Sequence, residues 1–224
     1  MICCMPAPFL PPVAPGDPLC AARLHQQINF IIEIDRAKNI LRQNLLTDAS
    51  RRENDAEHSW HLALMALVLR EYAAPEVDLF RVVQMLLLHD IVEIDAGDTF
   101  VYDDAAMAHK AERELLAAKR LFGLLPPDQA QQWRALWDEF EARESADARF
   151  AAALDRLQPM LCNYCAGGGG WKKHDVPMER VLERNALMGD GSEVLWAFAQ
   201  HMVRDAQRQG FLRSEAVEGN PAQP

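Results

Sequence analysis

Apolar residues recur at spacings of three and four along most of the chain, which is the pattern of amphipathic helices. Residues 82–88 are apolar almost all round and predict a central buried helix. No run alternates as a half-buried strand does, so we expect an all-α bundle of about eight helices. The recurring positions are Ile28, Ile31, Ile34 and Leu41; Leu62, Met65, Val68 and Leu69; Leu115, Ala118 and Phe122; Trp133, Leu136, Trp137 and Phe140; Phe150, Leu154, Leu157 and Leu161; Val181, Leu182 and Leu187; and Leu195, Phe198, Ala199 and Met202.

Both ends of the chain and one internal glycine run depart from this pattern. Six of the 13 prolines lie before residue 20, and proline removes backbone donors and restricts the preceding residue. We therefore expect a disordered extension over 1–22, one helical domain over 23–212 and a disordered tail over 213–224. Residues 167–170 are four glycines, which predict a flexible connector because they lose much backbone entropy in a helix.

Composition and charge exclude several classes of protein. The 224 residues are 50% hydrophobic and carry a net charge of −10, which disfavours binding to a nucleic-acid polymer. No uninterrupted apolar stretch is long enough to span a membrane, and we expect no membrane partner. The five cysteines are odd in number and unevenly spread, which argues against a disulfide framework and favours a reducing cytoplasm. Cys162 and Cys165 lack the second pair or nearby histidines of a zinc site and are interpreted as ordinary thiols.

Polar residues embedded in the apolar helices carry the candidate chemistry. His89 and Asp90 directly follow the apolar run 85–88, His58 opens an earlier helix, and Asp155 lies within a later one. Each alone has a structural explanation as a core histidine, a cap or an ion pair. Together they form a mixed nitrogen and oxygen donor set, which suits a divalent transition metal better than calcium or magnesium.

Three segments together resemble the HD-domain metal-dependent phosphohydrolases, and most closely the bacterial 5'-deoxynucleotidases and their eukaryotic relatives. The segments are RRENDAEHSWH, LLLHDIVEIDAGD and ALDRLQPMLCNY, and the resemblance covers roughly residues 24–212. It implies a single HD domain that hydrolyses (deoxy)nucleoside 5'-monophosphates to nucleoside and phosphate. It further implies one tightly bound divalent metal such as cobalt or manganese, magnesium at a weaker second site, and a cytoplasmic homodimer.

The resemblance also assigns roles to individual residues. Glu93 matches an acid that handles the proton of the water or leaving group, and Asp98 matches a second acid near the substrate. Counted back from the AEHSW string, Arg42 matches a phosphate-binding arginine of the family when one residue is gapped. Without the gap, the matching position is Gln43. The implied metal ligands are His58, His89, Asp90 and Asp155.

Several neighbouring residues have weaker assignments. Glu57 could orient an imidazole, while Asn163 and Trp60 are interpreted as pocket or packing residues. His109 is expected at a helix start, and Glu112 could join Glu93 and Asp98 in a second, oxygen-rich metal site.

Three other functions remain open. HD phosphodiesterases with two metals carry extra histidines between the doublet and the last aspartate, where this chain has only His109. Nucleoside triphosphate hydrolases of this kind are generally longer. A non-catalytic nucleotide-binding module is expected to have lost ligands or acids, and this chain keeps the four ligands and both acids.

Overall fold

The computed structural model describes residues 22–98, 102 and 109–213, and the two predicted terminal extensions lie almost wholly outside these ranges. The regular elements of the described residues are helices apart from one short ribbon, which confirms the all-α prediction. In chain order, with η for a 3-10 helix, the elements are α1 (Ala22–Ile34), η2 (Asp35–Asn39), β1 (Leu41–Leu45), β2 (Arg52–Asn54), α2 (Asp55–Val68), η3 (Arg70–Tyr72), α3 (Leu79–Leu88), η4 (His89–Val92), α4 (Glu93–Ala96), α6 (Lys110–Phe122), α7 (Pro127–Ala142), α8 (Ala146–Cys165), α9 (Gly169–Lys173), α10 (Met178–Asn185), α11 (Met188–Gly191) and α12 (Glu193–Arg208).

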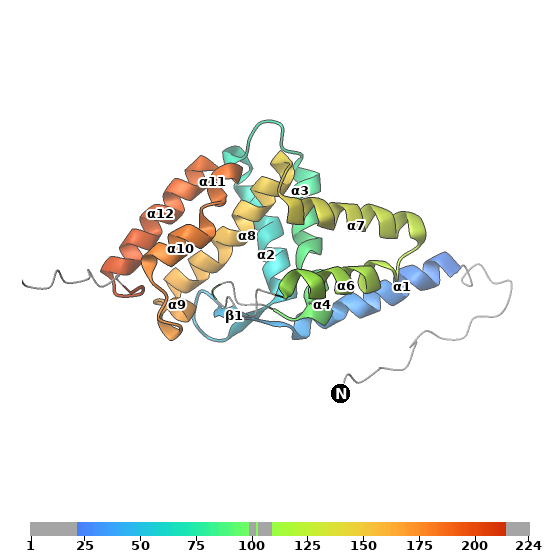
Figure 1. The fold of residues 1–224 in the computed structure, drawn as a ribbon, viewed down its shortest axis with the longest axis horizontal. Coiled ribbons are helices and arrows are strands. Elements are labelled where there is room, and N and C mark those ends of the chain that lie inside the picture. The colour runs from blue at the N-terminus through green and yellow to red at the C-terminus, as the bar shows by residue number, and fades with distance from the viewer. Residues whose placement is uncertain (1–21, 99–101, 103–108, 214–224) are drawn as a thin grey trace, which may run out of the picture.

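Helices α2, α3 and α8 form the middle of the bundle (Figure 1). Helices α1, α6 and α7 lie towards one end, and α9 to α12 lie towards the other. This order places the three elements that carry the polar motifs beside one another. The described helices include none that is long and apolar enough to cross a bilayer.

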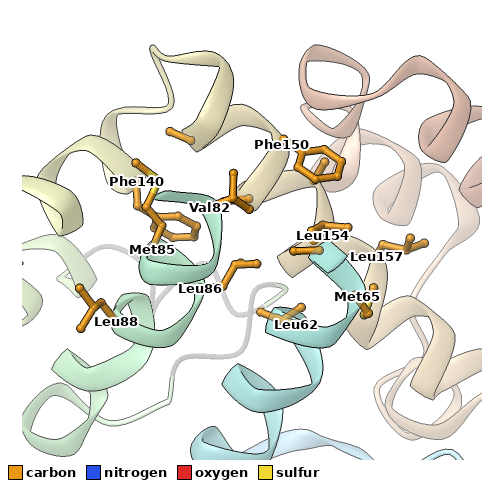
Figure 2. Packing of buried hydrophobic residues seen from close by; sticks show 14 of the residues in the cluster. Leu62, Met65, Val82, Met85, Leu86, Leu88, Phe140, Phe150, Leu154 and Leu157 are labelled. Atoms are coloured by element: carbon orange, nitrogen blue, oxygen red, sulfur yellow. The ribbon is translucent and has the colours of Figure 1, made fainter. Parts of the chain in front are cut away.

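The apolar faces of α2, α3 and α8 meet in the core (Figure 2). Leu62 from α2, Val82 and Leu86 from α3, and Leu154 from α8 are fully buried there. Removing apolar surface from water stabilises the fold by about 25 cal/mol per Å². The periodicity therefore identified the core-facing sides of these helices correctly.

The helical prediction was wrong between residues 41 and 54, where β1 and β2 form an antiparallel ribbon. Leu41 pairs with Asn54, and Leu41 is exposed rather than part of the apolar face of α1. The strands are five and three residues long, too short for alternation to be recognisable in the sequence. The ribbon leads directly into α2 and so connects Arg42 to the start of that helix.

Some apolar positions that the periodicity assigned to the core are on the surface. Val68 is 73% exposed at the end of α2, and Leu115 and Phe198 are also exposed. These residues satisfy the helical spacing, but they lie at the edge of the apolar stripe, where no neighbouring helix covers them within the described residues.

Candidate metal centre and substrate pocket

The candidate metal ligands come from three elements whose ends are fixed by local interactions. His58 lies in the first turn of α2, where Asn54 and Glu57 form a reciprocal capping box. His89 and Asp90 lie in η4, directly after α3. Asp155 lies in the middle of α8. Each side chain is thus carried by a rigid element, as a preorganised metal site requires.

The four side chains converge in the interior. His58 Nε2 lies 3.0 Å from Asp155 Oδ1 and 3.8 Å from Asp90 Oδ2. His89 Nε2 lies 3.1 Å from Asp90 Oδ2 and 3.4 Å from Asp155 Oδ1. The ligand atoms of His58, His89 and Asp155 all lie within 4.8 Å of one another, which is the spacing that one metal ion can bridge.

Hydrogen bonds on the far side of His58 determine which ring nitrogen faces the centre. Gln158 Nε2 donates to Glu53 Oε1 over 2.7 Å, which turns Gln158 Oε1 towards His58 Nδ1 at 3.1 Å. A carbonyl oxygen can only accept, so Nδ1 must donate and carry the proton. Nε2 therefore faces the Asp155 carboxylate, where it either donates a proton to that carboxylate or offers its lone pair to a metal ion.

His89 has the same arrangement. Its Nδ1 lies 2.9 Å from the backbone carbonyl oxygen of Leu86, which also can only accept. Its buried Nε2 has no hydrogen-bond partner of good geometry among residues 22–98, 102 and 109–213, and it faces two carboxylates. Two imidazole nitrogens and two carboxylates directed at one point need a proton or a metal ion for electrostatic balance. The donor set and its geometry therefore fit a divalent transition metal.

The pKa directions show how strongly these groups interact. Burial acts to lower the pKa of His89, but the carboxylates of Asp90 and Asp155 outweigh it and hold this pKa well above its usual value. Burial and Arg42 act to lower the pKa of His58, and Asp155 and Glu53 reverse the direction. Burial acts to raise the pKa of Asp155, yet the two histidines hold it well below its usual range.

Glu93 and Asp98 reach the same pocket on either side of a helix end. Glu93 opens α4, and Gly97 ends this helix with φ +76°, a backbone conformation that favours glycine. The loop therefore brings Asp98 beside Glu93, as expected from Gly97. Burial and Asp90 raise the pKa of Glu93 well above its ordinary value, and burial also raises the pKa of Asp98. Glu93 Oε2 and Asp98 Oδ2 are buried and have no hydrogen-bond partner in the part of the chain that the structure describes.

Arg42 points from β1 into this group of acids. Its Nη1 donates to Asp90 Oδ2 and lies 3.4 Å from Asp55 Oδ1. Gln43 also lines the pocket, but the interactions seen among the described residues include no hydrogen bond from its side chain to these acids. The structure thus places the guanidinium beside the candidate metal centre, in agreement with the gapped match.

The pocket extends from the acids towards the C-terminal helices. Lys110 and Arg156 add positive charge to the lining, whereas Tyr102 and Trp171 contribute aromatic side chains. The remaining described lining residues are Gln43, Asn44, Pro159, Met160, Asn163, Gly170 and Asn185. The pocket lining therefore combines charged groups with aromatic and amide groups, which suits a ligand with an anionic and an aromatic part.

The glycine run is not the flexible connector predicted from the sequence. Gly169 and Gly170 open α9, and the backbone N–H of Gly170 donates to Asn163 Oδ1 over 2.7 Å. A Cβ on Gly169 would lie 2.8 Å from Asn163 Oδ1, too close for any other residue without a shift. Asn163 Nδ2 donates to the carbonyl oxygen of Pro159 over 2.9 Å. The glycines therefore allow a tight turn that orients a pocket amide.

Other residues singled out in the sequence lie outside the pocket. Trp60 is 61% exposed, so it neither lines the pocket nor packs in the core. Glu57 caps α2 and pairs with Arg51 at 2.7 Å, so it does not orient an imidazole. His109 precedes α6 as expected, and Glu112 is exposed in its first turn. Burial raises the pKa of Cys162 to about 12, which fits an unreactive thiol.

Five pocket or supporting residues escaped the sequence analysis: Glu53, Asp55, Lys110, Gln158 and Trp171. Asp55 precedes His58 by three residues, and Gln158 follows Asp155 by three, so each shares a helix face with a candidate ligand. That spacing was the signal available for these two residues. The other three are brought to the site by long-range packing, which the spacing does not encode.

Comparisons with known proteins agree with this geometry. A family model described as HD domain matches residues 34–196. The 5'-deoxynucleotidase HDDC2 of Homo sapiens is 29% identical over 135 residues, and that of Bos taurus is 30% identical. Each match covers 60% of this chain but less than two thirds of the relative, 65% and 64% respectively. A predicted metal-dependent phosphohydrolase from Magnetospirillum magnetotacticum MS-1, known from a crystal structure, is 59% identical to this chain and has a TM-score of 0.80. The match covers 85% of this chain and 98% of that one.

Proposed function

The chain belongs to the HD domain family, and from this membership and the buried histidine–carboxylate cluster we propose that it is a metal-dependent phosphomonoesterase acting on deoxynucleoside 5'-monophosphates. The single observation that carries the proposal is that His58 and His89 both engage Nδ1 away from the centre and turn Nε2 towards Asp155 and Asp90. The names of the curated relatives supply the substrate class.

In this proposal His58, His89, Asp90 and Asp155 hold the metal. When bound, a divalent metal activates water near neutral pH and neutralises charge on phosphoryl oxygens. Gln158 and the carbonyl group of Leu86 keep both imidazoles in the tautomer that leaves Nε2 free. These contacts hold the donor atoms in place before any ligand arrives.

The charged side chains around the centre divide the remaining tasks. Arg42 binds phosphate oxygens, because its planar guanidinium matches two oxygens of a phosphate at once. Glu93 is buried, and its raised pKa favours the protonated form, so it donates its proton to the leaving 5'-oxygen. Asp98 accepts a hydrogen bond from the attacking water and orients it towards phosphorus.

The aromatic and amide groups of the lining are assigned to the nucleoside. Trp171 and Tyr102 offer aromatic surface, and Asn163 and Asn185 offer amide groups. A nucleoside has an aromatic base and several hydrogen-bonding groups, so this lining suits it better than a simple aliphatic phosphate.

The proposal is tested by phosphate release from a panel of nucleotides. The protein, purified without chelator, is assayed with deoxy- and ribonucleoside 5'-monophosphates, 3'-monophosphates, triphosphates and a phosphodiester, each with Co²⁺, Mn²⁺ and Mg²⁺. We expect release from 5'-monophosphates that requires Co²⁺ or Mn²⁺. Asp90→Ala abolishes it, while Asp95→Ala, which removes an acid paired with Arg120 on the outer side of α4, retains it. Preferred cleavage of triphosphates or diesters, or full activity of Asp90→Ala, would refute the assignment.

Three finer expectations accompany this proposal. Cobalt or manganese at one tight site, with magnesium binding more weakly, is tested by metal analysis of the purified protein. A homodimer is tested by sedimentation at several protein concentrations. Residence in the cytoplasm is tested by fractionating cells that express the chain.

A further inference from the structure

Asp55 is a buried carboxylate that the proposed function has not used. It is the first residue of α2, and its backbone N–H donates to the carbonyl oxygen of Ile40 over 3.2 Å. The residue is 1% exposed, and its Oδ2 has no hydrogen-bond partner among the described residues. Burying an ionised carboxylate is costly unless a positive charge compensates it, so this position calls for an explanation.

The compensating charge is the guanidinium of Arg42. Arg42 Nη1 lies 3.4 Å from Asp55 Oδ1 and also donates to Asp90 Oδ2. The ribbon places the two residues together, because Leu41 pairs with Asn54, the residues immediately before them. Among the described residues, Arg42 and Asp90 line the pocket and Asp55 does not. Asp55 thus contacts the arginine without lining the pocket itself.

Asp90 serves two cations in the proposed enzyme. A metal held by Asp90 withdraws electron density from this carboxylate and repels the nearby guanidinium, so the Arg42–Asp90 ion pair weakens. Asp55 is not in the His58–His89–Asp155 cluster, so a metal held there leaves its contact with Arg42 in place. It is therefore the partner that can retain the guanidinium beside the metal.

We propose that Asp55 is a positioning residue that holds the Arg42 guanidinium in place to bind the phosphate group when the metal is bound. The inference rests on the proposed function only in taking phosphate as the bound group. An alternative assigns Asp55, Asp90 and Glu93 to a second cation, since their ligand atoms lie within 4.8 Å of one another. Arg42 Nη1 already occupies the space between Asp55 and Asp90, so we favour the arginine as their shared cation.

Binding of inorganic phosphate distinguishes a positioning role from the mere presence of a charge. Replacing an acid near an anion site removes repulsion, so Asp55→Asn should tighten phosphate binding if Asp55 acts only through its charge. If Asp55 holds Arg42, the same change loosens the arginine and weakens binding. The two explanations therefore predict opposite signs.

The experiment is a double-mutant cycle measured by calorimetry with inorganic phosphate and the manganese-loaded protein. We expect Asp55→Asn to raise the phosphate Kd about tenfold and Arg42→Ala to raise it at least as much. The double variant should match Arg42→Ala within about twofold, because Asp55 acts through Arg42. Glu193→Gln, which removes an exposed acid from the first turn of α12, is the matched control and should not change Kd.

Three results would overturn the inference: an unchanged or lower Kd for Asp55→Asn, a further rise in the double variant beyond Arg42→Ala, or the loss of one equivalent of bound manganese from Asp55→Asn. The last result would assign Asp55 to a second cation site. Asp55→Ser, a smaller neutral variant, repeats the cycle if the asparagine variant does not fold. If the parent protein hydrolyses no nucleotide but the cycle gives the expected result, the proposed function fails while the positioning role stands.

Discussion

Gln158 Oε1 lies 3.1 Å from His58 Nδ1, and the same amide group donates through Nε2 to Glu53 Oε1 over 2.7 Å. One buried glutamine therefore joins a carboxylate to a candidate metal ligand. The amide cannot rotate without placing its N–H groups against His58, so it determines which imidazole nitrogen faces the centre. Asn44 supports Glu53 from β1 through a further hydrogen bond of 2.8 Å.

Gln158→Met should weaken metal binding by about 10- to 100-fold, since the variant keeps the side-chain volume but no longer accepts from His58 Nδ1. It also leaves Glu53 Oε1 without its amide partner, which costs about 1–3 kcal/mol of unfolding free energy. Calorimetric titration with Mn²⁺ and a denaturant curve measure the two effects. Gln132→Met on the exposed side of α7 is the matched control. A folded Gln158→Met protein with the parent's metal affinity would contradict the supporting role.

Metal affinity should rise with pH. The pKa values of His58 and His89 are raised in the metal-free protein by the carboxylates that face them, so these imidazoles hold protons at pH values where a free histidine would not. A metal must displace those protons, and its apparent affinity therefore falls as the pH drops through the raised pKa values. Titrations between pH 6 and 8, in buffers of different ionisation enthalpy, measure both the affinity and the proton release. A metal affinity that is the same at pH 6 and pH 8, with no proton released on binding, would argue against metal binding at Nε2.

Glu93→Gln should lower kcat by at least about 10²-fold for nucleotides and remove the fall of kcat at high pH. Burial and Asp90 raise the pKa of Glu93 and so favour its protonated form, and activity that needs this proton is lost as the pH rises through that pKa. The variant should lose much less activity with 4-nitrophenyl phosphate, whose leaving group needs no proton. Asp95→Asn, two residues further along α4, is the control. An equal loss on both substrates would show that Glu93 is not the acid.

Gly169→Ala should raise KM for the nucleotide, whereas Gly167→Ala should not. Both glycines have positive φ, so both substitutions strain the turn and cost about 1 kcal/mol of unfolding free energy. Only the Cβ at Gly169 would press on Asn163 Oδ1, because a Cβ at Gly167 meets nothing within 4 Å. Steady-state kinetics and thermal melts of the two variants separate strain from displacement of the pocket amide. Equal KM values in both variants would show that Asn163 does not take part in binding the nucleoside.

Much of the fold was predictable because its information is local. The spacing of Leu62 and Met65, and of Leu154 and Leu157, identified buried faces of α2 and α8, since helical periodicity depends only on residues within two turns. The sequence also indicated the four side chains that converge at the candidate metal centre, because burying a polar side chain costs free energy unless a partner or a metal ion compensates it. Gly97 correctly predicted that the helix ends between Glu93 and Asp98.

Only the tertiary structure decided which residues support those ligands. The placement of Arg42 rather than Gln43 beside Asp90 and the Gln158–Glu53 contact both depend on segments far apart in the chain. The glycine run shows the same limit: its composition indicated flexibility, whereas its packing against Asn163 makes it a tight turn. Residue type and spacing determine which groups can do the chemistry, but contacts between distant segments decide their orientation and their electrostatic partners.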